Sequence, residues 1–199
     1  MDRIPPAGEA AVARPLALQS NRERPRGRRL VSGASGVKRG PDLRKLTPTE
    51  KMAGDDEEDT RLLQELLQKA TDFIQSHRWC PPIERIYFGD GVGGVIAAFL
   101  FKFGSPIQGS PGDDRLWVVV GDMPSVYLVV DTAPDAAAAI EVYCELMDDW
   151  SQAVLDDRSL EKVFPVAAPP TKANARALMS RLKFLREKII PPRFRRDGS

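Results

Sequence analysis

The chain has 199 residues, with 29 Lys and Arg against 28 Asp and Glu, which gives a formal net charge of +1. Two cysteines, 15 glycines and 17 prolines exclude a disulfide scaffold and a collagen-like repeat. The longest apolar run, from Val92 to Phe101, is about half of the ~20 residues that a membrane helix needs. The N-terminus has no secretory apolar region, so we expect a cytoplasmic protein.

The charges and the aromatic residues are segregated along the chain. Residues 1–51 carry 12 basic and 5 acidic side chains (net +7), whereas residues 52–199 carry 17 and 23 (net −6). All 14 aromatic residues lie at or after Phe73. A charged segment without aromatic residues buries too little apolar surface to offset its ordering entropy. We therefore predict a disordered basic arm over residues 1–57, one α+β domain over residues 58–190 and a basic tail over residues 191–199.

The basic arm admits several interpretations. Its cluster from Arg22 to Arg29 could contact nucleic acid through phosphates, but no aromatic residue is interleaved for stacking on bases, and a solvated tail is favoured. A transit peptide is disfavoured because four prolines interrupt the helix that it needs. The arm could also be upstream sequence, because Met52 begins an acidic stretch that leads into the first convincing helix. Arg outnumbers Lys by 20 to 9, as in proteins from GC-rich bacterial genomes.

The first expected helix covers residues 59–78. Acidic residues from Asp55 to Asp59 precede its positive dipole end, and Pro81 and Pro82 end it. Its apolar residues recur at helical spacing and form one stripe: Leu62, Leu63, Leu66, Leu67, Ala70, Phe73 and Ile74.

Four segments of strand character follow. They are residues 83–88, 95–103, 116–120 and 126–130. Within the second, Phe99, Phe101 and Phe103 alternate with residues of the opposite face. The connections between the four segments are short and rich in Gly, Pro and Asp, so neighbouring strands should pair antiparallel. Two segments are apolar throughout, which predicts a sheet covered on more than one side.

Two helices are expected after the strands. Thr132 and Asp135 have the spacing of a capping box, with Pro134 in the first turn, and predict a helix to about Leu155. A last helix opens at Thr171 and ends before Pro191. The order α-β-β-β-β-α-α predicts an antiparallel four-stranded meander sheet packed by three helices.

A glycine-rich segment carries the one motif that could bind a cofactor. Gly89, Gly91 and Gly94 satisfy GxGxxG after a strand-like run. If residues 95–103 formed a helix, backbone amides there would hold a pyrophosphate, and Asp122 would be the acid that contacts the ribose. The period-two phenylalanines favour a hairpin loop instead. The four residues are therefore candidate cofactor-binding residues in an alternative interpretation only.

Other constellations are weaker. His77 and Cys80 have HxxC spacing, but no further histidine supports a metal site. A group of carboxylates on the helix before Leu155 is typical of a solvated face: Glu141, Glu145, Asp148 and Asp149. We expect no metal and no cofactor.

The sequence favours a non-catalytic binding or protein-interaction module, with catalysis left open. Its partner would be a protein or a small ligand, without membrane contact, and self-association is open. The alternative is a nucleotide- or phosphoanion-binding enzyme that uses the segment from Gly89 to Gly94.

Overall fold

The computed structural model describes residues 41–107 and 113–190. The fold is α+β, as predicted, and its sheet is antiparallel with strand order β1-β2-β3-β4-β5. The first 40 residues of the expected arm and the expected tail lie outside the described residues. The elements are β1 Thr47–Pro48, α1 Glu57–Gln75, β2 Ile83–Val92, β3 Ile96–Phe103, β4 Arg115–Gly121, β5 Val126–Val129, α2 Ala136–Leu155 and α3 Lys172–Phe184.

The sheet has five strands, so the predicted number of four is wrong. The additional strand, β1, lies in the segment that we assigned to the arm, and Thr47 and Pro48 pair with Phe88 and Tyr87 of β2. Met52, in the same segment, is 7% exposed and packs into the core. A two-residue edge strand that contains proline shows no alternation of polar and apolar residues, which is why the sequence did not reveal it.

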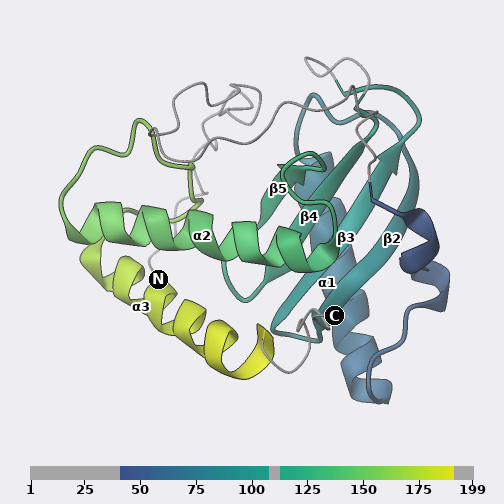
Figure 1. The fold of residues 1–199 in the computed structure, drawn as a ribbon, viewed down its shortest axis with the longest axis horizontal. Helices are drawn as coiled ribbons and strands as arrows, with labels where there is room; N and C mark the ends of the chain where they lie inside the picture. Colours follow the sequence, from purple (N-terminus) through teal and green to yellow (C-terminus); the bar gives the residue numbers. More distant parts are fainter. Residues whose placement is uncertain (1–40, 108–112, 191–199) are drawn as a thin grey trace, which may run out of the picture.

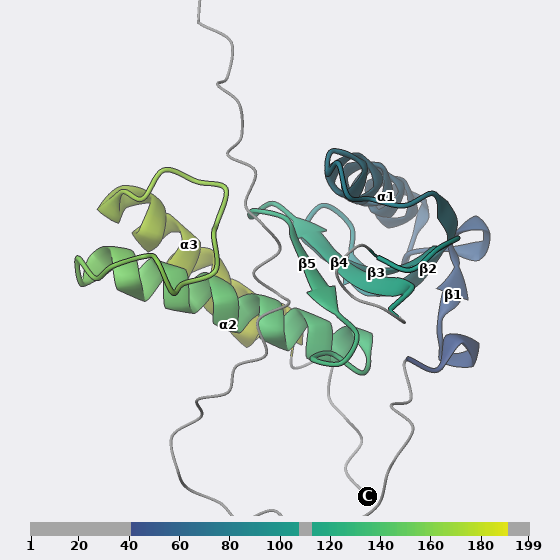
Figure 2. The same ribbon diagram turned by 90° about the horizontal axis from the view of Figure 1, so that it is seen from above.

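The helices cover both faces of the sheet, as the apolar strands predicted. Figure 2 shows α1 on one side of the sheet and α2 on the other. The alternating phenylalanines of β3 face α1, where they meet Leu63, Leu66 and Ile74. Residues of the opposite face, such as Leu100 and Trp117, belong to the core shared with α2 and α3. The sheet therefore offers neither face as a free apolar surface.

The second helix begins later than the capping box predicted. Asp135 is the N-cap of α2, and its side chain accepts a 2.8 Å hydrogen bond from the Ala138 N–H. The Thr132 hydroxyl instead donates to the Val129 carbonyl at 2.8 Å and closes the turn after β5. An aspartate is as good an N-cap as threonine, and here the turn after β5 engages the threonine.

The last helix lies beside α2. Figure 1 shows α2 crossing the sheet with its first half and extending beyond it with its second half, where α3 runs back along it. The apolar stripe of α3 is buried there, as expected: Ala175, Leu178, Leu182 and Leu185. The helix opens at Thr171, as expected, with this residue as its N-cap, and it passes into one π-helical turn, Leu185–Ile189. Among the residues that the structure describes, no helix is long and apolar enough to cross a membrane.

Candidate functional site

The glycine-rich segment forms a β-hairpin, as the phenylalanine alternation predicted. Gly89 and Gly91 lie inside β2, which is longer than expected, and Gly91 pairs with Ala97 of β3. Residues that we assigned to a loop therefore continue the strand, and the turn itself begins at Gly93. Gly94 has φ +70°, a conformation that glycine adopts without steric cost.

The hairpin turn rests on the first turn of α1. The backbone N–H of Gly93 donates a 2.7 Å hydrogen bond to the Asp59 carboxylate. A Cβ atom on Gly93 would lie 2.7 Å from a carboxylate oxygen of Asp59 and from Cβ of Leu62, so only glycine fits. Packing and backbone geometry thus account for the turn glycines without a ligand.

The helix that a dinucleotide site requires is absent from this position. Residues Ile96–Phe103 form β3, so no helix N-terminus faces the glycine-rich segment from its C-terminal side. The βαβ arrangement of the alternative interpretation is not formed here. Nucleotide binding itself stays a prediction that is open to test.

Asp122 follows β4, and its backbone lies beside the glycine turn. Its N–H donates to the Val95 carbonyl at 3.2 Å. Its side chain, in contrast, forms an ion pair with Arg181 of α3. The structure therefore brings the Asp122 backbone and Gly94 to the same end of the sheet, while the glycine turn packs on α1 and the Asp122 carboxylate pairs with α3.

A pocket of about 200 Å³ opens next to this ion pair. The β4–β5 turn supplies one side of it, α2 and α3 supply the others, and Ala168 of the connecting loop completes it. Its lining is mostly apolar, with two charged residues and one amide: Asp122, Met123, Pro124, Trp150, Ala168, Asn174, Ala177, Leu178 and Arg181. A few polar groups in an apolar concave surface are typical of a binding site.

Buried residues of α2 and of the β4–β5 turn fix the walls of the pocket. The Tyr143 hydroxyl of α2 donates to the Pro124 carbonyl at 3.0 Å and fixes the β4–β5 turn on the helix. Burial raises the pKa of Tyr143, so this phenol stays protonated and keeps its donor. Trp150 and Met123, at 3% and 5% exposure, form the floor. The pocket is thus a preformed feature of the packed core.

The rim of the pocket is polar and open to solvent. The Arg181 side chain is 47% exposed, and its guanidinium lies 5.4 Å from the centre of the Phe184 ring. Phe184 is the large hydrophobic residue that the described part of the chain leaves exposed. On the other side, the Asn174 amide donates to the Pro169 carbonyl at 2.9 Å.

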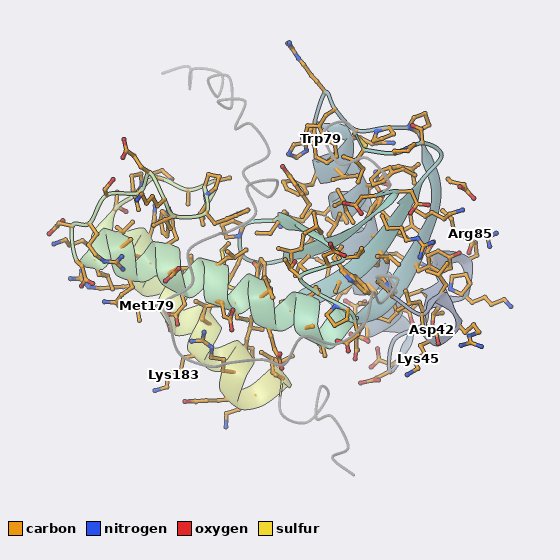
Figure 3. The ribbon with its side chains drawn as sticks, turned by 45° about the horizontal axis from the view of Figure 1, so that its top comes forward. Asp42, Lys45, Trp79, Arg85, Met179 and Lys183 are labelled. Atoms are coloured by element: carbon orange, nitrogen blue, oxygen red, sulfur yellow. The ribbon has the colours of Figure 1, made fainter. Side chains whose placement is uncertain are left out.

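The α3 segment is rich in basic side chains, and four of them pair with carboxylates: Lys172 with Asp157, Arg181 with Asp122, Lys183 with Glu187 and Arg186 with Asp148. Residues 172–190 contain six basic side chains and one acidic side chain, Glu187, although residues 52–199 as a whole are net −6. Figure 3 shows Lys183 pointing away from the body of the protein. We call the α3 face the set of exposed side chains Lys172, Arg176, Ser180, Lys183 and Phe184. The sequence contained this signal as a basic excess along one helix, but without the fold it did not indicate a site.

Two weaker candidates have structural explanations. His77 lies among aromatic rings at the end of α1, with ring centroids 5.0 Å from Phe73 and 5.3 Å from both Trp79 and Tyr127. Of the carboxylates on α2, Asp148 pairs with Arg186 at 3.1 Å. In the described part of the chain, no three His, Cys, Asp or Glu side chains are placed to hold a metal ion.

Comparison of the chain with protein-family models, with curated proteins and with solved structures finds no match. The site is therefore interpreted from its own geometry.

Proposed function

We propose that this chain is a non-catalytic protein-interaction module that binds its partner through the α3 face and the adjoining pocket. The observation that carries the proposal is the pocket itself, which is lined by Ala177, Leu178 and Arg181 of the same helix that carries the basic side chains. A pocket of about 200 Å³ is smaller than the ~300–1,000 Å³ of sites that enclose drug-sized ligands. It suits one side chain of a larger partner.

The surroundings of the pocket resemble the anatomy of a protein interface. Aromatic residues and arginine dominate the energetically important positions of interfaces, with polar residues around them. Here Trp150 lines the floor, and Arg181 and Phe184 lie at the rim. The charges of Arg176 and Lys183 would speed association with an acidic partner and select against basic ones.

Site-specific photo-cross-linking in cells tests the proposal. Benzoylphenylalanine replaces Lys183 in the full chain, and the matched control carries it in place of Glu65, an exposed residue on α1. We expect a discrete adduct from position 183 and none from position 65. Its mass minus the 22.0 kDa of this chain gives the mass of the partner, and a doubling of that mass identifies a second copy.

The same experiment includes a charge-reversed variant. Because electrostatic attraction supports the encounter, Arg176→Glu in the cross-linking variant should weaken the adduct, and added salt should weaken it further. Equal adducts from positions 183 and 65, or no adduct from either, would contradict the proposal.

A further inference from the structure

We infer that the pocket receives the C-terminal apolar residue of a protein partner, whose carboxylate takes the place of Asp122 at Arg181. This inference rests on the proposed function and specifies the chemistry of the bound group. The pocket combines a space for one apolar side chain with a guanidinium at its rim. A chain terminus presents the same combination, an apolar side chain and a carboxylate on one Cα atom.

The apolar part of the ligand is specified by the walls. Trp150, Leu178 and Met123 are buried side chains that line the space, and Pro124 and Ala177 complete its apolar lining. An apolar side chain placed there gains free energy by leaving water, whereas a charged side chain would lose its hydration without compensation. The walls therefore select an aliphatic or small aromatic side chain.

The carboxylate is specified by Arg181. A guanidinium presents five N–H donors in a planar fork that matches a carboxylate. In the structure a carboxylate already lies against it, that of Asp122. Asp122 thus shows that this position accepts a carboxylate, and it is also the group with which a ligand must compete.

The competition is weak enough to be reversed by a ligand. The two side chains are 47% and 27% exposed, and an ion pair in contact with solvent contributes little to stability because water and salt screen it. Burial of an apolar side chain in the pocket is the favourable contribution that would offset the loss of this pair. Asp122 therefore pairs with Arg181 in the free protein, and a ligand carboxylate replaces it when the apolar side chain of the ligand is buried in the pocket.

Two small probes separate the parts of this inference. N-acetyl-L-leucine carries the apolar side chain and the terminal carboxylate, and N-acetyl-L-leucinamide carries the same side chain without the charge. Both are titrated to millimolar concentration into the ¹⁵N-labelled full chain and followed by amide chemical shifts. We expect the acid to shift the amides of Met123, Ala177 and Arg181, and the amide to bind more weakly.

Three variants are expected to change the binding of the two probes in different ways. Asp122→Asn removes the competing charge and should strengthen binding of N-acetyl-L-leucine by about 2–5-fold. Arg181→Gln should abolish the difference between the acid and the amide. Arg186→Gln removes another arginine–aspartate pair from the same region and should change neither affinity. Amide spectra of the free variants show whether each is folded.

The outcomes also separate this inference from the proposed function. Equal binding of both probes to the unmodified chain, shifts that map away from the pocket, or no effect of Asp122→Asn would overturn the inference, while the cross-linking result would stand on its own. Selective binding of the acid without a cross-linked partner would support the recognised chemistry and assign it to a free small carboxylate, which overturns the protein partner.

Discussion

The backbone N–H of Gly93, in the turn between β2 and β3, donates a 2.7 Å hydrogen bond to the carboxylate of Asp59 in the first turn of α1. The same carboxylate accepts a 3.0 Å hydrogen bond from the Asp55 N–H ahead of the helix. One side chain therefore joins the helix start to the hairpin turn. The glycine-rich segment is explained by this contact and by its own backbone.

Gly94→Ala should destabilise the protein. Gly94 has φ +70°, and an alanine there is strained by about 1 kcal/mol or more. Gly104→Ala is the matched control, because a Cβ atom there meets only the Pro82 carbonyl at 3.7 Å. Urea denaturation of both variants measures the difference. Equal stability of the Gly94 variant and the unmodified chain would contradict the backbone explanation.

Nucleotides should leave the melting temperature unchanged. NAD, FAD or ATP at millimolar concentration stabilises only a protein that binds it in the native state. We expect no thermal shift, because Ile96–Phe103 is a strand and not the helix that this motif needs after it, and because the Gly93 N–H is already bonded to the Asp59 carboxylate. A concentration-dependent shift that Gly94→Ala removes would instead support the nucleotide-binding alternative, and Asp122 would be the first acid to replace.

Trp150→Ala should be among the most destabilising single changes. The side chain is 3% exposed and packs in the core between the sheet, α2 and α3. Truncation of a buried tryptophan costs about 3–5 kcal/mol. Chemical denaturation measures the loss. An unchanged free energy of unfolding, with binding of N-acetyl-L-leucine lost, would show that Trp150 serves the ligand alone.

Two N-terminal truncations test where the domain begins. A chain that starts at Pro41 should melt like the full chain, because the described packing begins there. A chain that starts at Met52 loses β1 and the partly buried Leu43 and Leu46. We expect that loss to cost about 2 kcal/mol, or roughly 4–8 °C in melting temperature. Identical melting of both truncations would show that β1 contributes nothing.

The buried thiol of Cys144 should make the protein less stable at alkaline pH. Burial raises its pKa from 9.0 to about 11. The unfolded chain then loses the thiol proton at lower pH than the folded chain. The contribution of this thiol to stability is therefore fully present below pH 9 and is lost as the pH rises toward 11.

The effect is measured by urea denaturation between pH 8 and pH 10. Cys144 should account for about 1 kcal/mol of the decrease in that interval. In Cys144→Ala the decrease should be smaller by that amount, although Tyr143 contributes in both proteins because burial raises its pKa too. Parallel decreases in the two proteins would show that the thiol ionises equally in both states.

Local patterns in the sequence were sufficient for most of the secondary structure. The alternation of Phe99, Phe101 and Phe103 identified β3 as a strand and placed its two faces, because side chains of a strand alternate whatever they pack against. The stripes of α1 and α3 identified their buried sides for the corresponding reason at helical spacing. Fold class and antiparallel pairing follow from such short-range rules.

The boundaries that depend on partners could not be read in this way. β1 is a strand only because β2 lies beside it, and Thr47 and Pro48 have no strand pattern of their own. Asp135 and not Thr132 caps α2, because the turn after β5 engages the threonine. In both cases a contact with a neighbouring segment, and not the local sequence, decided the boundary.

The candidate site is decided by tertiary structure alone. The position of Asp122 after a strand made it a candidate binding residue in the sequence. Its partner Arg181, however, lies 59 residues further along the chain. The pocket exists because the β4–β5 turn, the projecting half of α2 and the side of α3 converge. The sequence by itself determined the three long helices and strands β2 to β5, since helix and strand periodicity are local properties. Only packing brought the carboxylate, the guanidinium and the apolar walls together, because no short-range rule relates side chains so far apart in the chain.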